Sequence, residues 1–74
     1  MVKCEIRENY DSYGTGNFTE DKSRRDVFEM SEEQCIRAIA LHNAMGREHY
    51  ETSKRIVYFS FSDARHCTEY IYYK

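Results

Sequence analysis

Residues 31–46 contain both a helix start signal and a helix stop signal, and this feature most constrains how the chain can fold. Ser31 is a favoured N-cap residue, and Gln34, three positions later, completes a capping box with it. Glu32 and Glu33 place negative charge at the positive end of the helix dipole. Gly46 can adopt the left-handed conformation that ends a helix. The sequence therefore predicts one helix of about four turns.

Apolar residues recur along this segment at helical spacing and predict the face that packs on the rest of the chain. The stripe consists of Cys35, Ala38, Ile39, His42 and Met45. We interpret His42 as a histidine at the edge of the core, with one ring nitrogen bonded to a backbone carbonyl. A metal ligand or catalytic base is the alternative for His42, and it requires partners that the helix does not supply.

Four segments outside the helix predict strands: residues 2–8, 26–30, 55–61 and 67–73. The first alternates cleanly, with Val2, Cys4 and Ile6 on one side, which is typical of a half-buried strand. The predicted fold is α+β, a small antiparallel sheet of about four strands (ββαββ) with one helix packed across one face. The whole chain, residues 1–74, forms a single domain.

Two segments predict connections rather than strands. Residues 9–25 predict the turn of a wide hairpin, because two glycines interrupt them, and residues 47–54 predict a polar link. Gly14, Thr15 and Gly16 match a phosphate-binding loop only weakly, since no helix follows them and no lysine takes the required position.

The last two predicted strands have apolar side chains on both faces, so two arrangements are open. In the favoured one, the following residues face the helix: Val2, Cys4, Ile6, Phe28, Val57, Phe59, Phe61, Cys67, Ile71 and Tyr73. Tyr58, Tyr70 and Tyr72 then point outward. In the other arrangement Tyr70 and Tyr72 belong to the core, and the outward patch consists of Tyr58, Ile56 and Ile71.

Seven tyrosines and four phenylalanines are a high aromatic content for 74 residues, and exposed aromatic patches usually mark interfaces. The predicted partner-binding residues are Tyr58, Tyr70 and Tyr72 on the sheet, Tyr10 and Tyr13 in the glycine-containing loop, and Arg55. A formal net charge of -2 provides no strong field for nucleic acid.

The sequence predicts no catalytic residue, metal site or cofactor, and hence no enzyme. Cys4, Cys35 and Cys67 match neither a disulfide framework nor a zinc pattern and predict buried free thiols. Asp63, His66 and Cys67 are close in sequence, but neighbouring residues on a strand point to opposite faces. Without a basic-then-apolar leader or an apolar run of ~20 residues, we expect a cytoplasmic protein with no membrane span.

In size, lack of proline and aromatic content, the chain is similar to the small accessory proteins of phages and mobile elements, such as anti-CRISPR proteins. This similarity implies a non-enzymatic protein that binds a larger host protein and blocks it. A homodimer is the second possibility, because so short a chain has a thin margin of stability. A single-stranded nucleic-acid binder that stacks bases on the same aromatic face is the third.

Overall fold

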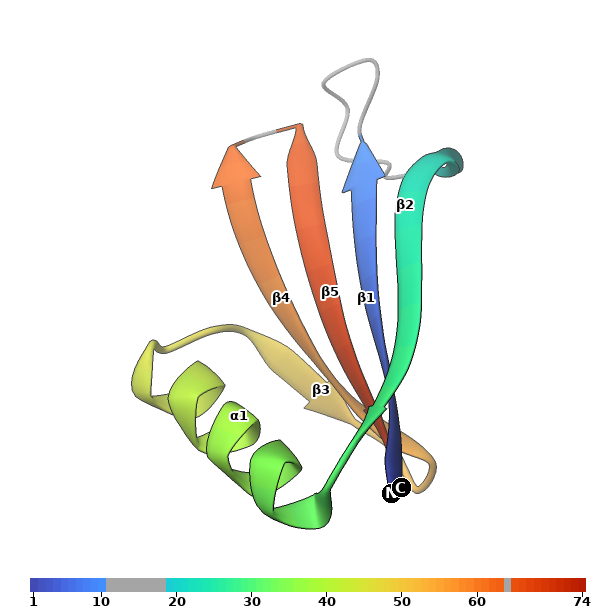
Figure 1. The fold of residues 1–74 in the computed structure, drawn as a ribbon. Coiled ribbons are helices and arrows are strands. Elements are labelled where there is room, and N and C mark those ends of the chain that lie inside the picture. Colours follow the sequence, from blue (N-terminus) through green and yellow to red (C-terminus); the bar gives the residue numbers. More distant parts are fainter. Residues whose placement is uncertain (11–18, 64) are drawn as a thin grey trace.

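The computed structural model describes residues 1–10, 19–63 and 65–74, with side chains described for residues 1–9, 25–63 and 65–74. Its elements are, in order, β1 (Val2–Tyr10), β2 (Thr19–Met30), α1 (Glu32–Ala44), β3 (His49–Glu51), β4 (Arg55–Asp63) and β5 (His66–Tyr73). The strands form one antiparallel sheet of order β2-β1-β5-β4-β3 (Figure 1). The predicted α+β class is confirmed, with five strands in place of about four.

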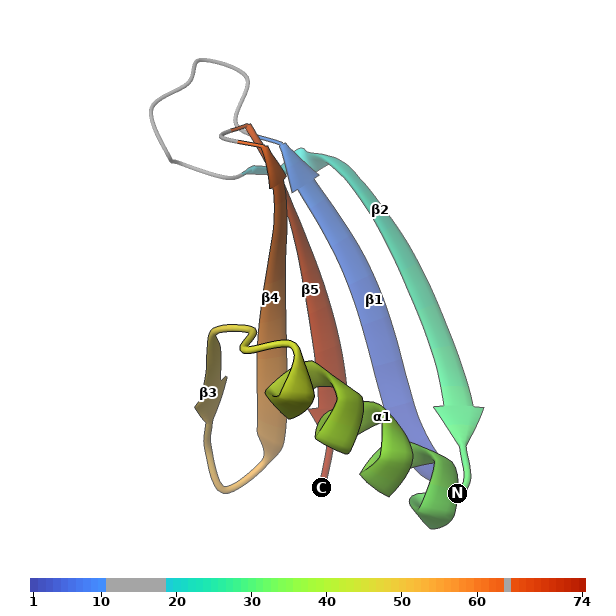
Figure 2. The same ribbon diagram turned by 90° about the vertical axis from the view of Figure 1, so that its left-hand side faces the viewer.

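Helix α1 crosses one face of the sheet, near the end where β1 begins. Figure 2 shows the helix on one side of the sheet, with no described element on the opposite side. The strands therefore have one face that packs against α1 and one open face. This asymmetry places the candidate site.

The caps of α1 are those that the sequence predicts. The Ser31 hydroxyl oxygen accepts from the Gln34 backbone N–H at 3.2 Å, and the Gln34 side chain accepts from the Ser31 backbone N–H at 3.1 Å. Gly46 has a φ of 69°, in the left-handed region. Met45 was predicted to be buried and is 58% exposed, because it is the C-cap residue beyond the last helical position.

The strand register decides which residues face α1. Cys4 pairs with Tyr72 and Tyr72 pairs with Ile56, and the Cys4 sulfur contacts Cys35 of the helix. Residues two positions along each strand lie on the same face, so Tyr58 and Tyr70 also face α1. The favoured outward arrangement of Tyr58, Tyr70 and Tyr72 is therefore wrong. The other arrangement is right that Tyr70 and Tyr72 face the helix and that Ile71 faces outward, but it is wrong for Tyr58 and Ile56, which also face α1.

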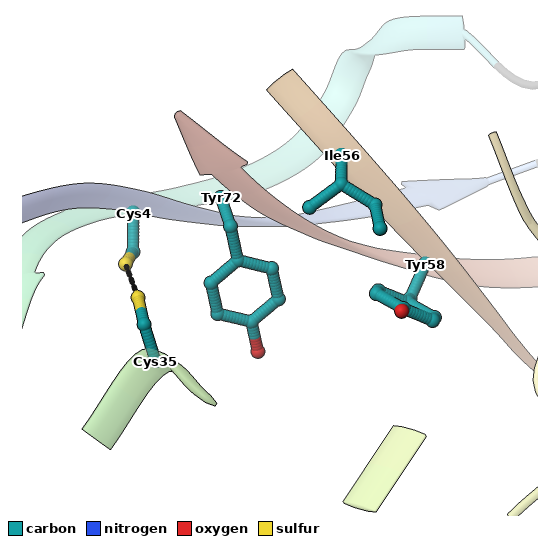
Figure 3. Packing of buried hydrophobic residues seen from close by; sticks show 5 residues of the cluster. All are labelled: Cys4, Cys35, Ile56, Tyr58 and Tyr72. Atoms are coloured by element: carbon teal, nitrogen blue, oxygen red, sulfur yellow. Dashed lines mark hydrogen bonds between the residues drawn. The ribbon is translucent and has the colours of Figure 1, made fainter. Parts of the chain in front are cut away.

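The core lies between α1 and the sheet (Figure 3). Its buried cluster consists of Cys4, Cys35, Ile56, Tyr58 and Tyr72. Of the residues predicted to face α1, four do so: Val2, Cys4, Ile6 and Phe28. Six others lie on the open face instead: Val57, Phe59, Phe61, Cys67, Ile71 and Tyr73. The reason is that β4 and β5 have apolar side chains on both faces, so alternation alone does not distinguish the faces.

The strands extend further than predicted: β1 and β4 each end two residues later, and β5 begins one residue earlier. The largest differences concern β2 and β3. β2 begins at Thr19 instead of residue 26, because its charged residues lie on an edge strand, where water reaches one side of the backbone. The link over residues 47–54 contains β3, whose three residues are all exposed and show no apolar alternation. The weak phosphate-loop match at residues 14–16 lies outside the described residues.

Candidate functional site

Three of the five tyrosines predicted to contact a partner, Tyr58, Tyr70 and Tyr72, lie beneath α1. Tyr58 is 1% exposed and Tyr72 is 7% exposed, and Tyr70 is half-buried. A partner therefore cannot reach the side chains of Tyr58 and Tyr72 in this structure. The Tyr10 side chain and all of Tyr13 lie outside the described parts of the chain.

Beneath α1, His42 joins the helix to the sheet through both ring nitrogens. Its Nδ1 lies 2.7 Å from Nη1 of Arg47, and its Nε2 lies 2.7 Å from the hydroxyl oxygen of Tyr72. A guanidinium can only donate, so Nδ1 accepts from Arg47 and Nε2 holds the proton that is donated to Tyr72. The predicted core-edge position of His42 is confirmed, but its partners are side chains rather than a backbone carbonyl.

The environment of His42 keeps the imidazole neutral. Burial lowers its pKa from 6.5, and the positive charge of Arg47 lowers the pKa further. Burial likewise raises the pKa of Tyr72 to about 12. The imidazole ring also stacks on Tyr58, with ring centroids 4.6 Å apart. The neutral His42 thus holds α1 on the sheet through a hydrogen bond to Tyr72 and a ring contact with Tyr58.

The open face forms the opposite surface of the sheet. The register places sixteen described residues on it: Lys3, Glu5, Arg7, Asn9, Arg25, Val27, Glu29, Tyr50, Arg55, Val57, Phe59, Phe61, Cys67, Glu69, Ile71 and Tyr73. They divide into two parts. An aromatic half lies over β3, β4 and the end of β5, and a charged half lies over β2, β1 and the middle of β5.

The aromatic half consists of Tyr50, Phe59, Phe61 and Tyr73, together with Arg55. The rings of Tyr50 and Phe59 lie 5.7 Å apart, and Phe61 is 55% exposed. Arg55, one of the predicted contact residues, is half-buried here and donates to the Tyr50 hydroxyl at 3.0 Å. This surface therefore presents aromatic rings beside a guanidinium that is already held in place.

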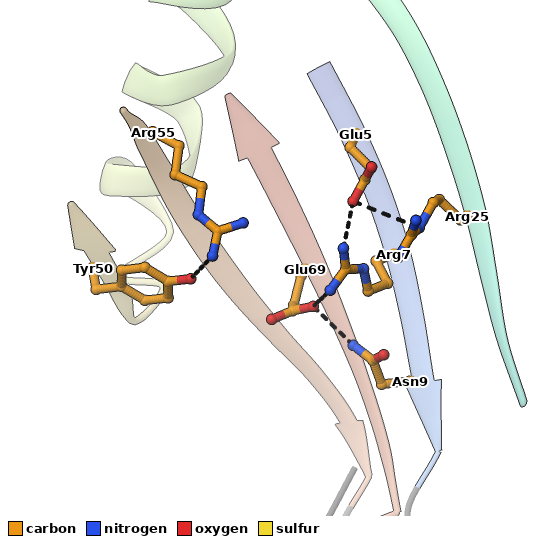
Figure 4. Close-up of polar contacts among 7 residues, drawn as sticks. All are labelled: Glu5, Arg7, Asn9, Arg25, Tyr50, Arg55 and Glu69. Atoms are coloured by element: carbon orange, nitrogen blue, oxygen red, sulfur yellow. Dashed lines mark hydrogen bonds and ion pairs between the residues drawn. The ribbon is translucent and has the colours of Figure 1, made fainter. Parts of the chain in front are cut away.

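The charged half is a connected network (Figure 4). Arg7 donates to Glu5 at 2.9 Å and lies 3.8 Å from Glu69, and Arg25 also lies 3.8 Å from Glu5. The Asn9 side-chain amide donates to Glu69 at 3.0 Å. Opposite charges offset one another across this half, so it does not present a concentrated positive field.

The sequence missed most of the aromatic half. Phe59, Phe61 and Tyr73 were assigned to the helix side, and only their alternation with Tyr58, Tyr70 and Tyr72 indicated that one of the two sets must be outward. Tyr50 gave no usable signal, because β3 is only three residues long. It reaches the open face by pairing with Val57.

The remaining chemistry-bearing groups are the cysteines and the other titratable side chains. All three cysteines are buried free thiols, as predicted. Within residues 1–10, 19–63 and 65–74, no three His, Cys, Asp or Glu side chains are grouped so that they could hold a metal ion. No described helix is long and apolar enough to cross a membrane.

No protein-family model, curated protein or solved structure matches the chain. The open face and the cluster around His42 are therefore interpreted from the geometry of the described residues alone.

Proposed function

We propose that this chain is a non-enzymatic binding protein that blocks a larger partner protein, and that it contacts the partner through the aromatic half of the open face. The observation that supports this most directly is the placement of Tyr50, Phe59, Phe61 and Tyr73 on one face that no described element covers, with Arg55 next to Tyr50 and Tyr73. Tyrosine, phenylalanine and arginine are enriched at protein interfaces and among the residues that contribute most binding energy.

The aromatic half is organised before any partner arrives. Arg55 is bonded to Tyr50, and Tyr50 contacts the Phe59 ring. Val57 and Ile71, which pair with each other on the same face, are buried and form the base under these side chains. Side chains that are already ordered lose less conformational entropy on binding, which favours affinity.

The outer surface of α1 is a weaker candidate. Ile36, Leu41 and Met45 are exposed there, but they are aliphatic and lie on two different flanks of the helix. The sheet face has larger rings, a guanidinium and a rigid base. We therefore place the contact on the sheet.

A protein partner fits this face better than a nucleic acid. Arg7 and Arg25 lie beside Glu5, and Arg55 is bonded to Tyr50, so these guanidinium groups are already engaged. Single-strand binding proteins combine stacking rings with a positively charged groove that follows the backbone. The small size and aromatic content support the narrower proposal of an anti-CRISPR-like blocking protein of phages or mobile elements, acting on a host defence machine.

The test compares two exposed apolar residues on opposite sides of the molecule. Phe61 is 55% exposed on the open face and Leu41 is 60% exposed on α1. Tagged wild type, Phe61→Ser and Leu41→Ser are used to capture partners from host lysate, with and without nuclease. We expect one stoichiometric protein to be captured by wild type and Leu41→Ser after nuclease treatment, and at least tenfold less of it by Phe61→Ser.

Three outcomes contradict the proposal. Equal capture by Phe61→Ser moves the contact away from the open face. Capture only without nuclease supports the nucleic-acid alternative, which should also weaken steeply with added salt. If wild type captures nothing and its mass in solution is that of two chains, self-association explains the exposed rings instead.

A further inference from the structure

Cys4 and Cys35 meet across the interface between β1 and α1, although 31 positions separate them in the sequence. Their sulfur atoms lie 3.8 Å apart, and Figure 3 shows the two side chains pointing toward each other beside Tyr72. Both residues are buried, at 1% and 5% exposure. The fold thus holds two thiols at close range in a protein that contains three.

We propose that Cys4 and Cys35 form a dithiol site that a low-molecular-weight disulfide, such as glutathione disulfide, oxidises to an intramolecular disulfide that locks α1 onto β1. One thiolate attacks the small disulfide, forms a mixed disulfide and releases one small thiol. The second protein thiolate displaces the other small thiol. Two electrons and two protons pass from the protein to the oxidant, which is reduced to two thiols.

The geometry requires only a short approach of the two sulfurs. A disulfide bond is about 2.05 Å long, so atoms that start 3.8 Å apart must approach by about 1.8 Å. The two cysteines belong to different elements, and α1 is attached along one side only. Cys35 and His42 are its buried residues, and Ala38 and Ile39 are half-buried. A small shift of the helix on the sheet closes the distance.

The closed structure also limits when the reaction occurs. Burial and the neighbouring Cys35 thiol raise the pKa of Cys4 to about 12, so Cys4 stays protonated while α1 is in place. Since the thiolate is the nucleophile in exchange, oxidation proceeds when α1 lifts and exposes the pair. Reclosing then brings the second sulfur to the mixed disulfide.

Cys67 is an internal control for the oxidation of Cys4 and Cys35. It pairs with Asn9 and Phe61 on the open face, so the sheet separates it from Cys4 and Cys35. It is a buried free thiol like the others. In the folded protein, oxidation should therefore consume two particular thiols and leave the third.

The first test counts thiols by mass. The reduced chain is incubated under native conditions at mildly alkaline pH with excess glutathione disulfide, quenched with acid, unfolded and alkylated. We expect one alkylated cysteine instead of three, with Cys4 and Cys35 linked in the peptide map. The cross-link should raise Tm by more than about 10 °C, because it closes a loop of over thirty residues, and dithiothreitol should reverse the shift.

Cys67→Ser should form the same cross-link, whereas Cys4→Ser and Cys35→Ser should form none. We also expect the glutathione concentration that reduces half of the pairs to be at least tenfold higher in the native protein than in denaturing urea. Equal concentrations would show that the fold does not favour the pair. The proposal also fails if three free thiols, stable glutathione adducts on Cys4 and Cys35, or a link to Cys67 are found in the native protein.

Discussion

Nε2 of His42 lies 2.7 Å from the hydroxyl oxygen of Tyr72, within the interface between α1 and β5. A second tyrosine of the sheet makes a similar link, since the Tyr58 hydroxyl donates to the Asn43 side chain at 3.0 Å. The helix is thus located on the sheet by hydrogen bonds that involve the hydroxyls of two tyrosines, as well as by apolar packing. Directional bonds restrict the position of α1 in a way that area burial alone does not.

Removing the two hydroxyls should have unequal effects on stability. Tyr72→Phe leaves the His42 N–H buried without its acceptor, and we expect a loss of ~1–3 kcal/mol in the free energy of unfolding. Tyr58→Phe leaves the exposed Asn43 side chain without its donor, and water can replace that donor. We therefore expect a loss of only ~0.5–1 kcal/mol in the free energy of unfolding. Urea unfolding of both variants at pH 7.5 measures the difference. A larger loss for Tyr58→Phe would contradict the buried link.

Stability should decrease as pH falls below neutrality, because the pKa of His42 is lowered in the folded state. Below about pH 6.5 the unfolded chain binds a proton at His42 that the native protein does not bind. The contribution of His42 is thus fully present above the unfolded pKa and is lost as pH falls through the folded pKa. Urea unfolding between pH 7.5 and 5 should show this decline.

The control for the decline in stability between pH 7.5 and 5 is His42→Gln, which leaves His49 and His66 in place. Its stability should be lower than that of wild type at pH 7.5 but should change less between pH 7.5 and 5. Glu51 and Asp63 also have lowered pKa values, but their reference pKa values are 4.5 and 3.8, so their effect belongs to more acidic solutions. An unchanged pH slope in His42→Gln would show that another group titrates.

The sequence predicted the helix well because its signals are local. The capping box of Ser31 and Gln34 and the stop at Gly46 each involve residues within one turn, and both are found. The strand faces depend on pairing between distant segments. In β4 the set that contains Tyr58 and the set that contains Phe59 both include large apolar side chains, so only tertiary contact with α1 selects between them.

The candidate site was predictable in kind but not in detail. An aromatic surface with Arg55 at its edge was expected, and the open face provides one with a different set of rings. The links from Tyr72 and Tyr58 to the helix were not predictable, because a tyrosine suits an outward face and a buried one equally well. His42 was recognised as a core-edge residue, but its partner Arg47 lies beyond the helix stop.

The charged half of the open face should contribute measurably to stability. Arg7→Gln removes the closest partner of Glu5, whose side chain is 6% exposed, and leaves Arg25 at 3.8 Å. We expect a loss of ~2–4 kcal/mol in the free energy of unfolding, since a buried carboxylate loses its closest charge partner. Arg37→Gln is the matched control, because Arg37 pairs with Glu33 where both side chains are about three-quarters exposed. It should cost ~0.3–0.5 kcal/mol.

Measuring the free energy of unfolding of Arg7→Gln and Arg37→Gln in concentrated salt gives a second test. Screening weakens exposed ion pairs much more than buried ones. The difference between Arg37→Gln and wild type should therefore vanish in concentrated salt, whereas the Arg7→Gln difference should persist. Similar losses for the two variants in dilute buffer would mean that the Glu5 network contributes no more than a surface pair.

The end of α1 depends on the backbone conformation of Gly46, whose φ is 69°. A side chain at this position would find open space, since a Cβ added to Gly46 would have no heavy atom of another segment within 4 Å. The cost of Gly46→Ala is therefore conformational, and we expect a loss of ~1–2 kcal/mol in the free energy of unfolding. Gly46→Asn should lose less, because asparagine tolerates the left-handed region better than alanine. Thermal or urea unfolding of the two variants would reveal the order, and equal losses would point to a contact of the side chain rather than to backbone strain.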